Sequence, residues 1–506
     1  MTEPTDFNDL ARAAGLDEVR KQVKDAKPVE DTPGKRKPRL KIVQTSALDQ
    51  AQAEQEDAPM PPPEGSEDAI AQDVADQHHH ELSFVPGMGW MTDVGTHWAS
   101  DVMMVRYQWT RSIVRVHALE ASDRREQKRL ASAKSVNSVV QLLQADPKII
   151  TPVDAYDRDP HMLNTPAGLV DLQTGKLRER AGDRVTQLTR VSPDPRQKCP
   201  VWSAFLRDVF DADRTMIEFM QRTVGYTMTA ERREQKLFFM FGLGANGKST
   251  FWDVIQWMLG TYAMKLPASV LMRSNGDRHP TEIAQLHRKR LAISSELDEG
   301  QHLNESRVKE LTGDATITAR YMRQDFFEFA LTQKHVMVGN YRPRIQGGDA
   351  AMARRIVLVP FNATFSGKKR DMRLAEKLQA EAPAIMAWAV RGAVAWYSDG
   401  LGIPASVQAA SAEYMVANDD VVQWFEECCE RDVLDERTKA GLLYTSFAHW
   451  IKARGQHAMA MRTWAERMSA IPGMRKVKAS SIFYLGVRLK IEEIKRMSAQ
   501  NERWTP

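Results

Sequence analysis

A short apolar run, Leu237–Phe241, leads directly into a glycine-rich segment of the form G-x-x-x-x-G-K-[ST]. The glycines allow the tight turn that this pattern makes between the end of a strand and the start of a helix. The helix expected from Lys248 onward carries Trp252, Ile255 and Leu259 on one face, so it can pack on a sheet. The motif therefore predicts an α/β fold built around a phosphate-binding loop.

The predicted loop suits the triphosphate of ATP. Backbone N–H groups would surround the β-phosphate, and the positive end of the helix would face the same anion. Lys248 would neutralise the β- and γ-phosphates, and Ser249 would hold Mg²⁺. The predicted ATP-binding residues are Gly242, Gly244, Ala245, Asn246, Gly247, Lys248, Ser249 and Thr250.

The rest of the chain divides by pattern. From Lys236 to Phe361 strands alternate with helices, which is typical of a parallel sheet covered by helices. With 506 residues, several domains are expected. The predicted segments are a disordered tail (1–80), an α/β accessory domain (82–230), the P-loop domain (231–370), a helical subdomain (371–410) and a basic C-terminal domain (411–506).

The two ends of the chain differ in charge. Residues 1–80 contain 10 Lys and Arg against 17 Asp and Glu, with no apolar period, and are predicted to be disordered. Residues 431–506 contain 15 Lys and Arg against 7 Asp and Glu. Three helices and a β ribbon are expected in 411–506, the order of a winged helix. Its ribbon would contact duplex DNA through Arg475, Lys476 and Lys478; the alternative is an ordinary solvated basic face.

The composition also bears on location. No run of about 18 apolar residues exists, so no membrane span or membrane partner is expected. The polar N-terminus does not resemble a secretory signal, and three cysteines cannot form a disulfide framework. We expect a cytoplasmic protein.

Two further apolar strands are expected to end in polar residues. The run Leu291–Ser295 leads to Glu296, which is suited to lie beside Mg²⁺ or the attacking water, with Asp298 close behind. The run His335–Gly339 leads to Asn340, which could orient water against the γ-phosphate. For the acids, the alternative is that they are ordinary surface groups.

A hairpin is predicted between these two strands, with strands Thr316–Ala319 and Phe326–Phe329. The tip could contact phosphates by charge and a base by stacking, or it could be a solvated turn. Its predicted DNA-binding residues are Arg320, Tyr321, Arg323 and Gln324. Arg354 and Arg355 precede the last strand, and either could reach a neighbour's ATP site or form a structural salt bridge.

The succession GLGANGKST, AISSELDEG, KELTGDATITAR, FFEFALTQKHVMVGNYRP and AMARRIVLVPF resembles the superfamily III helicase domain. More narrowly, it resembles the phage and plasmid primase–helicase group, which also includes the poxvirus replicative helicase-primase. The segment HMLNTPAGLVDLQTG is similar to the domain that precedes the motor in that group. The segments EAPAIMAWAVRGAVAW and SAEYMVANDDVVQWF are similar to the region on the C-terminal side of the motor in the same group.

The resemblance implies a variant AAA+ ATPase that acts as a homohexamer and moves 3′→5′ on single-stranded DNA during phage or plasmid replication. It implies that Asn340 is the sensor, that Glu296 is the acid of the second motif, and that Arg354, ahead of Arg355, is the arginine finger. Because Ser295 stands where many relatives have an acid, Glu296 could be metal ligand or general base.

Many relatives carry an N-terminal primase domain, whereas here only 1–80 precedes the accessory domain. A separate primase and host replication proteins in a bacterial cytoplasm are therefore expected as partners. Two other functions remain open: an ATPase that melts or binds an origin without travelling, and a DNA-binding initiator that uses ATP only as an assembly switch.

Overall fold

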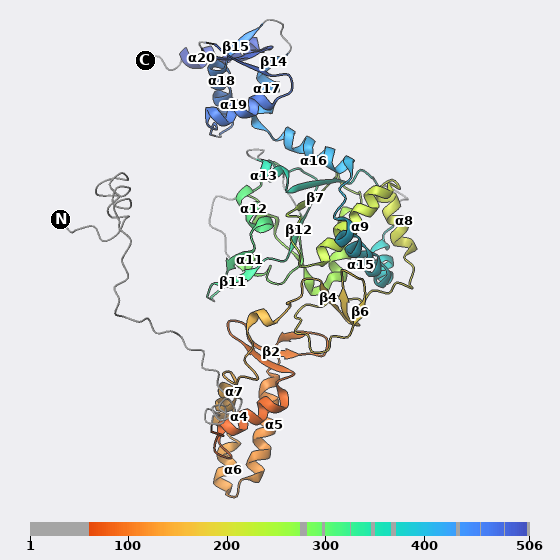
Figure 1. Ribbon diagram of the computed structural model, residues 1–506, viewed down its shortest axis with the longest axis vertical. Coiled ribbons are helices and arrows are strands. Elements are labelled where there is room, and N and C mark those ends of the chain that lie inside the picture. Colours follow the sequence, from red (N-terminus) through yellow and green to blue (C-terminus); the bar gives the residue numbers. More distant parts are fainter. Residues whose placement is uncertain are drawn as a thin grey trace, which may run out of the picture. The chain divides into compact units, whose positions relative to one another are not determined.

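The computed structural model describes residues 60–273, 281–295, 299–323, 325–345, 350–365, 371–431, 436–455, 457–479 and 481–502 (Figure 1). All elements named below belong to the compact unit Pro63–Pro506.

A five-stranded parallel sheet forms the centre of the P-loop domain, as the alternating pattern predicts. Four of its strands are buried along nearly their whole length, which is typical of a sheet covered on both faces, whereas the edge strand β8 (Ala263–Lys265) is partly exposed. In spatial order they are β13 (Ile356–Pro360), β7 (Leu237–Phe241), β12 (Lys334–Gly339), β9 (Leu291–Ser295) and β8.

Alternate residues of the sheet point into two different cores. Phe238 and Met240 of β7 join one core, and Leu237 and Phe239 join the other, because side chains alternate across a strand. The first core is completed by α8 (Pro200–Val209), α9 (Arg214–Met228), α10 (Lys248–Leu259), α14 (Leu374–Ala380) and α15 (Ala382–Asp399). The second is completed by α11 (Thr281–Ala284), α12 (Glu305–Gly313), α13 (Ala350–Ala353) and α16 (Ala405–Ala417).

The prediction that residues 1–80 are disordered is wrong for their last part. Helix α4 spans Glu67–His78, and Ser66 caps it by accepting a hydrogen bond from the Ala69 N–H at 3.1 Å. Ile70 and Val74 are fully buried against the helices α5 (Val105–Glu120) and α7 (Ala133–Leu143). Its apolar face is short and made partly of alanine, so it is hard to see amid acidic and glutamine-rich sequence.

A three-stranded antiparallel sheet follows α4, with strands β1 (Leu82–Val85), β2 (Gly89–Asp93) and β3 (Trp98–Ser100). After it come α5, the short helix α6 (Arg124–Leu130) and α7. Helices α4, α5, α6 and α7 pack on one another around a core of their own.

The predicted boundary at residue 230 is also wrong, because residues 162–228 share a core with the central sheet. Strands β4 (Met162–Thr165), β5 (Gly168–Asp171) and β6 (Leu177–Arg178) form a small antiparallel sheet. Leu163 and Val170 lie in the same apolar cluster as α8, α9 and β7. The segment before the P-loop is therefore part of the motor domain.

The C-terminal region has its own core and contains the three expected helices and the ribbon. Its helices are α17 (Asp420–Cys428), α18 (Ala440–Ala453), α19 (Met461–Ala470) and α20 (Ile491–Glu502). Its strands are β14 (Cys429–Arg431), β15 (Arg437–Lys439), β16 (Arg475–Lys478), β17 (Ile482–Leu485) and β18 (Val487–Leu489). Unlike the expected order, strands β14 and β15 lie between the first two helices and α20 follows the ribbon. Strands β15, β17 and β16 form one antiparallel sheet in that order. The predicted boundary at 410 falls inside α16, because that helix continues to Ala417.

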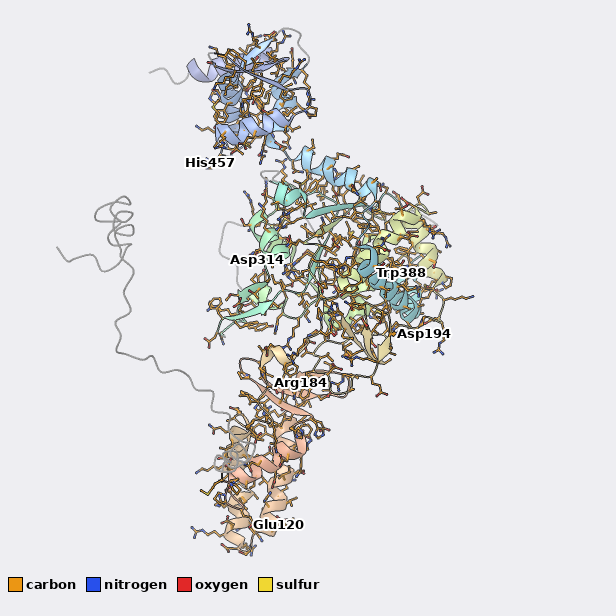
Figure 2. All side chains as sticks on the ribbon, in the orientation of Figure 1. Glu120, Arg184, Asp194, Asp314, Trp388 and His457 are labelled. Carbon is orange, nitrogen blue, oxygen red and sulfur yellow. The ribbon has the colours of Figure 1, made fainter. Side chains whose placement is uncertain are left out.

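Helices α9 and α15 cross at two glycines. A Cβ on Gly225 would collide with the backbone of Ala393, and a Cβ on Gly392 with the carbonyl of Gln221. Trp388 of α15, labelled in Figure 2, packs edge-on against Trp202 of α8, and the two ring centroids are 5.4 Å apart. Although α15 is apolar, no helix of the described residues is long and apolar enough to cross a bilayer.

We expect Gly392→Ala to lower the free energy of unfolding by about 1–3 kcal/mol, because the added methyl group forces α9 and α15 apart. Chemical denaturation of the full chain measures the effect. Gly441→Ala is the matched control, since a Cβ on this glycine of α18 meets nothing within 4 Å. Equal stability of the two variants would contradict the close crossing.

Candidate nucleotide site

The segment after β7 forms the loop that the glycine pattern predicts. Gly244 and Gly247 have φ of +108° and +84°, a region open to glycine at little steric cost, and Ala245 has φ of +46°. Such alternation of backbone conformation turns consecutive N–H groups toward one point and makes an anion-binding concavity. Helix α10 begins at Lys248, so its N-terminal end faces the same point.

The loop is supported from behind by the chain that leaves β13. The Asn246 side chain donates a hydrogen bond to the Phe361 carbonyl at 3.2 Å, and the Phe365 N–H donates to the Ala245 carbonyl at 2.7 Å. A Cβ on Gly242 would collide with the Asn246 amide, and one on Gly247 would lie 2.8 Å from Val209 Cγ2. These close contacts explain why glycine stands at both positions.

Lys248 points its amino group back into the loop. Its side chain is buried and donates to the Gly242 carbonyl at 2.6 Å, to Asn246 Oδ1 at 2.9 Å and to Asn340 Oδ1 at 3.1 Å. Removal from water disfavours the charged ammonium and lowers the pKa of Lys248 from its ordinary value of 10.5 to about 8. The Lys248 amino group is therefore a cation that can lose its proton near pH 8, and the three oxygens that it contacts are neutral.

The sheet order brings Asn340 to Lys248. Strand β12 lies between β7 and β9 and ends at Gly339, opposite Phe241, so the next residue reaches the loop. Ser249 is exposed on the first turn of α10. On the other side of β12, β9 ends at Ser295. The predicted acids Glu296 and Asp298 come after it and lie outside the described residues.

The two candidate arginines differ in burial. Arg355 is buried and donates to Thr312 Oγ1 at 3.1 Å and to the Ala351 carbonyl at 2.8 Å, so it holds α12 and α13 to the sheet. Arg354 is exposed. Of the pair, the structure leaves only Arg354 with a guanidinium directed away from this core.

The predicted hairpin is present as β10 (Thr316–Ala319) and β11 (Phe327–Ala330). Its second strand begins one residue later than predicted. Arg320 lies over the Phe326 ring, 4.6 Å from its centroid, and Arg323 is exposed. Gln324 is outside the described residues.

Tyr321 makes more contacts with the rest of the domain than is expected of a residue at the tip of a hairpin. Its hydroxyl donates to the Ala284 carbonyl at 3.1 Å, and its ring stacks on Phe327, which stacks on Phe329. His287 touches both phenylalanines. Sequence reasoning overlooked this aromatic row, although the alternation of Phe327 and Phe329 along one strand face could have indicated it.

The basic residues predicted for the C-terminal ribbon all lie on β16. Arg475, Lys476 and Lys478 are exposed. On α19, Arg462 is exposed and pairs with Glu466 at 3.3 Å, whereas Arg467 is mostly buried and lies 3.8 Å from Asp419. Arg467 therefore faces the interior of the domain, and the ribbon carries the open charge.

Known proteins share parts of this chain. Residues 71–211 match the family described as "D5 N terminal like", and residues 240–355 match a family of unknown function, DUF5906. "Putative helicase L207/L206" of Acanthamoeba polyphaga mimivirus is 24% identical over 41% of this chain and 22% of its own. "Putative helicase 022R" of Frog virus 3 is 26% identical over 51% of this chain and 28% of its own. "Putative primase C962R" of African swine fever virus is 25% identical over 40% of this chain and 22% of its own.

The match to each of these relatives spans less than a third of its length. Among solved structures, the apo NrS-1 C-terminal region superposes with a TM-score of 0.48 at 11% identity, over 83% of this chain and 98% of that chain. The chain therefore combines a phosphate-binding loop on a parallel sheet with a segment that matches the D5 N-terminal-like family. The chain is thus similar to viral proteins that are named as helicases or primases.

The lowered pKa of Lys248 leads to a pH dependence of nucleotide affinity. Phosphate binds the protonated amino group, so the affinity for ADP should be greatest below the pKa of about 8 and fall as the pH rises through it. Titration calorimetry from about pH 7 to pH 9 measures this, with a loss on the order of tenfold per pH unit above the pKa.

Lys248→Arg is the control, because an arginine keeps its charge throughout this range. Its affinity, whatever its absolute value, should change little with pH. An equally steep pH response in both proteins would assign the effect to another group.

Proposed function

We propose that this protein is an ATP hydrolase that drives DNA unwinding. The observation that carries the proposal is the hydrogen bond from Lys248 in the phosphate loop to Asn340 beyond β12. The loop and its lysine are enough to bind a nucleotide. Hydrolysis also needs a polar side chain that orients the attacking water, and Asn340 from the neighbouring strand could be that side chain. Helicase and primase names among the relatives support the same function.

The strand order supports an AAA+ type of motor. One strand, β12, lies between β7, which leads into the loop, and β9. Strand β9 ends at Ser295, and Glu296 is the next residue in the sequence. In this arrangement Lys248 and the loop N–H groups bind the phosphates, and Ser249 with Glu296 would hold Mg²⁺. The ion would neutralise charge on the transferring phosphoryl group. Whether Glu296 binds the metal or accepts the water proton is left to experiment.

Assembly into a homohexamer would complete the site. Exposed Arg354 is the candidate to reach the γ-phosphate of a neighbouring subunit, where positive charge stabilises the transition state. Buried Arg355 would support it by holding α13 to the sheet. The hairpin tip with Arg320 and Arg323 would face single-stranded DNA in the ring and move it in the 3′→5′ direction.

The C-terminal region would contact duplex DNA as a winged helix. Helices α17, α18 and α19 with the sheet β15-β17-β16 have the order of that fold. Exposed Arg475, Lys476 and Lys478 would lie along phosphates. A separate primase and host replication proteins would be the further partners.

The same basic ribbon is compatible with two alternative functions: an origin-binding or origin-melting ATPase that does not travel, and a DNA-binding initiator that uses ATP only as an assembly switch. Strand displacement on a forked duplex separates the travelling helicase from both, and ATP turnover separates the ATPase from the initiator. A travelling helicase releases strands in proportion to ATP turnover, whereas an initiator binds without sustained release.

We expect Lys248→Ala to abolish ATP hydrolysis, because it removes the charge that faces the β- and γ-phosphates. The melting temperature should not fall, since the variant no longer buries an ammonium. Lys265→Ala is the control: this lysine of β8 is exposed and has only a 4.0 Å contact with Asp253. Undiminished turnover by folded Lys248→Ala would refute the loop assignment.

Arg354→Ala should also be inactive, because its neighbour's ATP site would lack the arginine; mixing it with Lys248→Ala subunits tests this. When Arg354→Ala and Lys248→Ala subunits are combined in equal amounts, about one interface in four pairs an intact loop with an intact arginine, so turnover should partly return. Arg355→Ala should instead lower the melting temperature, because Thr312 loses a buried partner. Failure of every mixing ratio to restore turnover would remove the support for a shared site.

A further inference from the structure

A groove of about 450 Å³ lies among the helices of the D5-type segment, far along the chain from the nucleotide loop. Tyr107, Arg111 and Arg115 line it from α5, and Asn137 lines it from α7. The three α5 residues are spaced by four, so they form one line on the helix surface. Glu120, which ends this helix, is labelled in Figure 2.

The arginines of the groove are not neutralised. Residues 105–143 contain 8 Lys and Arg against 3 Asp and Glu, a net charge of +5. Nearby Arg106 and Arg129 form ion pairs with Asp101 and with Glu67 and Glu126. Within the described part of the chain, neither Arg111 nor Arg115 has an acidic oxygen within ion-pair distance, and both are exposed.

Two like charges four residues apart on a helix repel each other, which destabilises the helix slightly. Because no acid in the described residues compensates for it, the pair is best explained by an anionic ligand. A guanidinium matches a phosphodiester in geometry, and the two arginines lie about 6 Å apart along the helix axis. They could therefore hold successive phosphates of one strand.

The remaining groove residues indicate a single strand. Tyr107 is partly exposed, Arg106 lies over its ring at 4.9 Å from the centroid, and an unpaired base can stack on the part of such a ring that faces solvent. Exposed Asn137 offers an amide for a base edge, and Val114 and Val136 form an apolar floor. We propose that this groove binds single-stranded DNA, with phosphates at Arg111 and Arg115 and a base on Tyr107.

This second DNA contact rests on the proposed function only for its choice of substrate, since it needs neither ATP nor the hairpin tip. It would hold the strand by a part of the chain that takes no part in hydrolysis. The full chain can therefore be tested for it without nucleotide.

The test is the affinity of Arg111→Glu/Arg115→Glu for a fluorescein-labelled oligothymidylate, measured by anisotropy over a series of KCl concentrations. We expect the affinity to fall at least on the order of tenfold. The slope of log affinity against log salt should decrease by about 1.4, because each single-strand phosphate contact contributes about 0.7.

Arg196→Glu/Arg214→Glu is the matched control, with the same change of charge at side chains that are 92% and 90% exposed. It should bind like the unaltered protein. Arg111→Lys/Arg115→Lys should recover most of the salt slope, and Tyr107→Leu should lose affinity with the slope unchanged. Thermal melting identifies any variant that fails to fold, and Arg111→Gln/Arg115→Gln then takes the place of the reversed pair.

Unchanged affinity and slope in the folded Arg111 and Arg115 variants would overturn the proposal, as would an equal loss in the control pair. An equal loss on duplex DNA would assign the groove to duplex and overturn the single-strand occupant. Failure of the proposed function has a different signature: no ATP turnover by the unaltered protein, with the groove-dependent DNA binding intact.

Discussion

The geometry of the nucleotide site depends on one ammonium group that is buried among neutral oxygens. Lys248 meets carbonyl and amide oxygens from the loop and from the strand beyond it, so three pieces of chain must hold their places together. That requires β12 to lie beside β7, and it requires glycine where Asn246 and Val209 press against the loop. An incoming phosphate would replace these neutral acceptors with charged ones, which restores the usual preference of lysine for its proton.

Features of the site that depend on local sequence could be predicted. The apolar runs at β7, β9 and β12 are followed by the loop, by Glu296 and by Asn340, and parallel strands bring their carboxyl ends to one edge. Loop, sheet and hairpin could therefore be predicted from pattern alone. The order of helices and ribbon near the C-terminus depends equally on local periodicity.

Features that depend on packing between distant segments could not. Arg354 and Arg355 are adjacent and chemically identical, and only the tertiary position of Thr312 makes one of them a buried support. Helix α4 lies in acidic sequence, and its small apolar face can be recognised only once α5 and α7 are seen to pack against it. The groove with Arg111 and Arg115 likewise forms only when α5 and α7 pack together. The boundary at 230 failed because α8 and α9 look like an independent helical pair until their partners in the sheet are known.

The shared core has a consequence for how such proteins can diversify. The D5-type match ends at residue 211, between α8 and α9, yet both helices contribute to the apolar cluster that supports β7. A recombination event at that point would separate α8 from α9, although both helices pack in the core that supports β7. Exchange of the N-terminal segment between related proteins would be less disruptive upstream of β4, because α4 to α7 have a core of their own. Divergence among related proteins would then follow the boundaries between packed cores rather than the limits of sequence similarity.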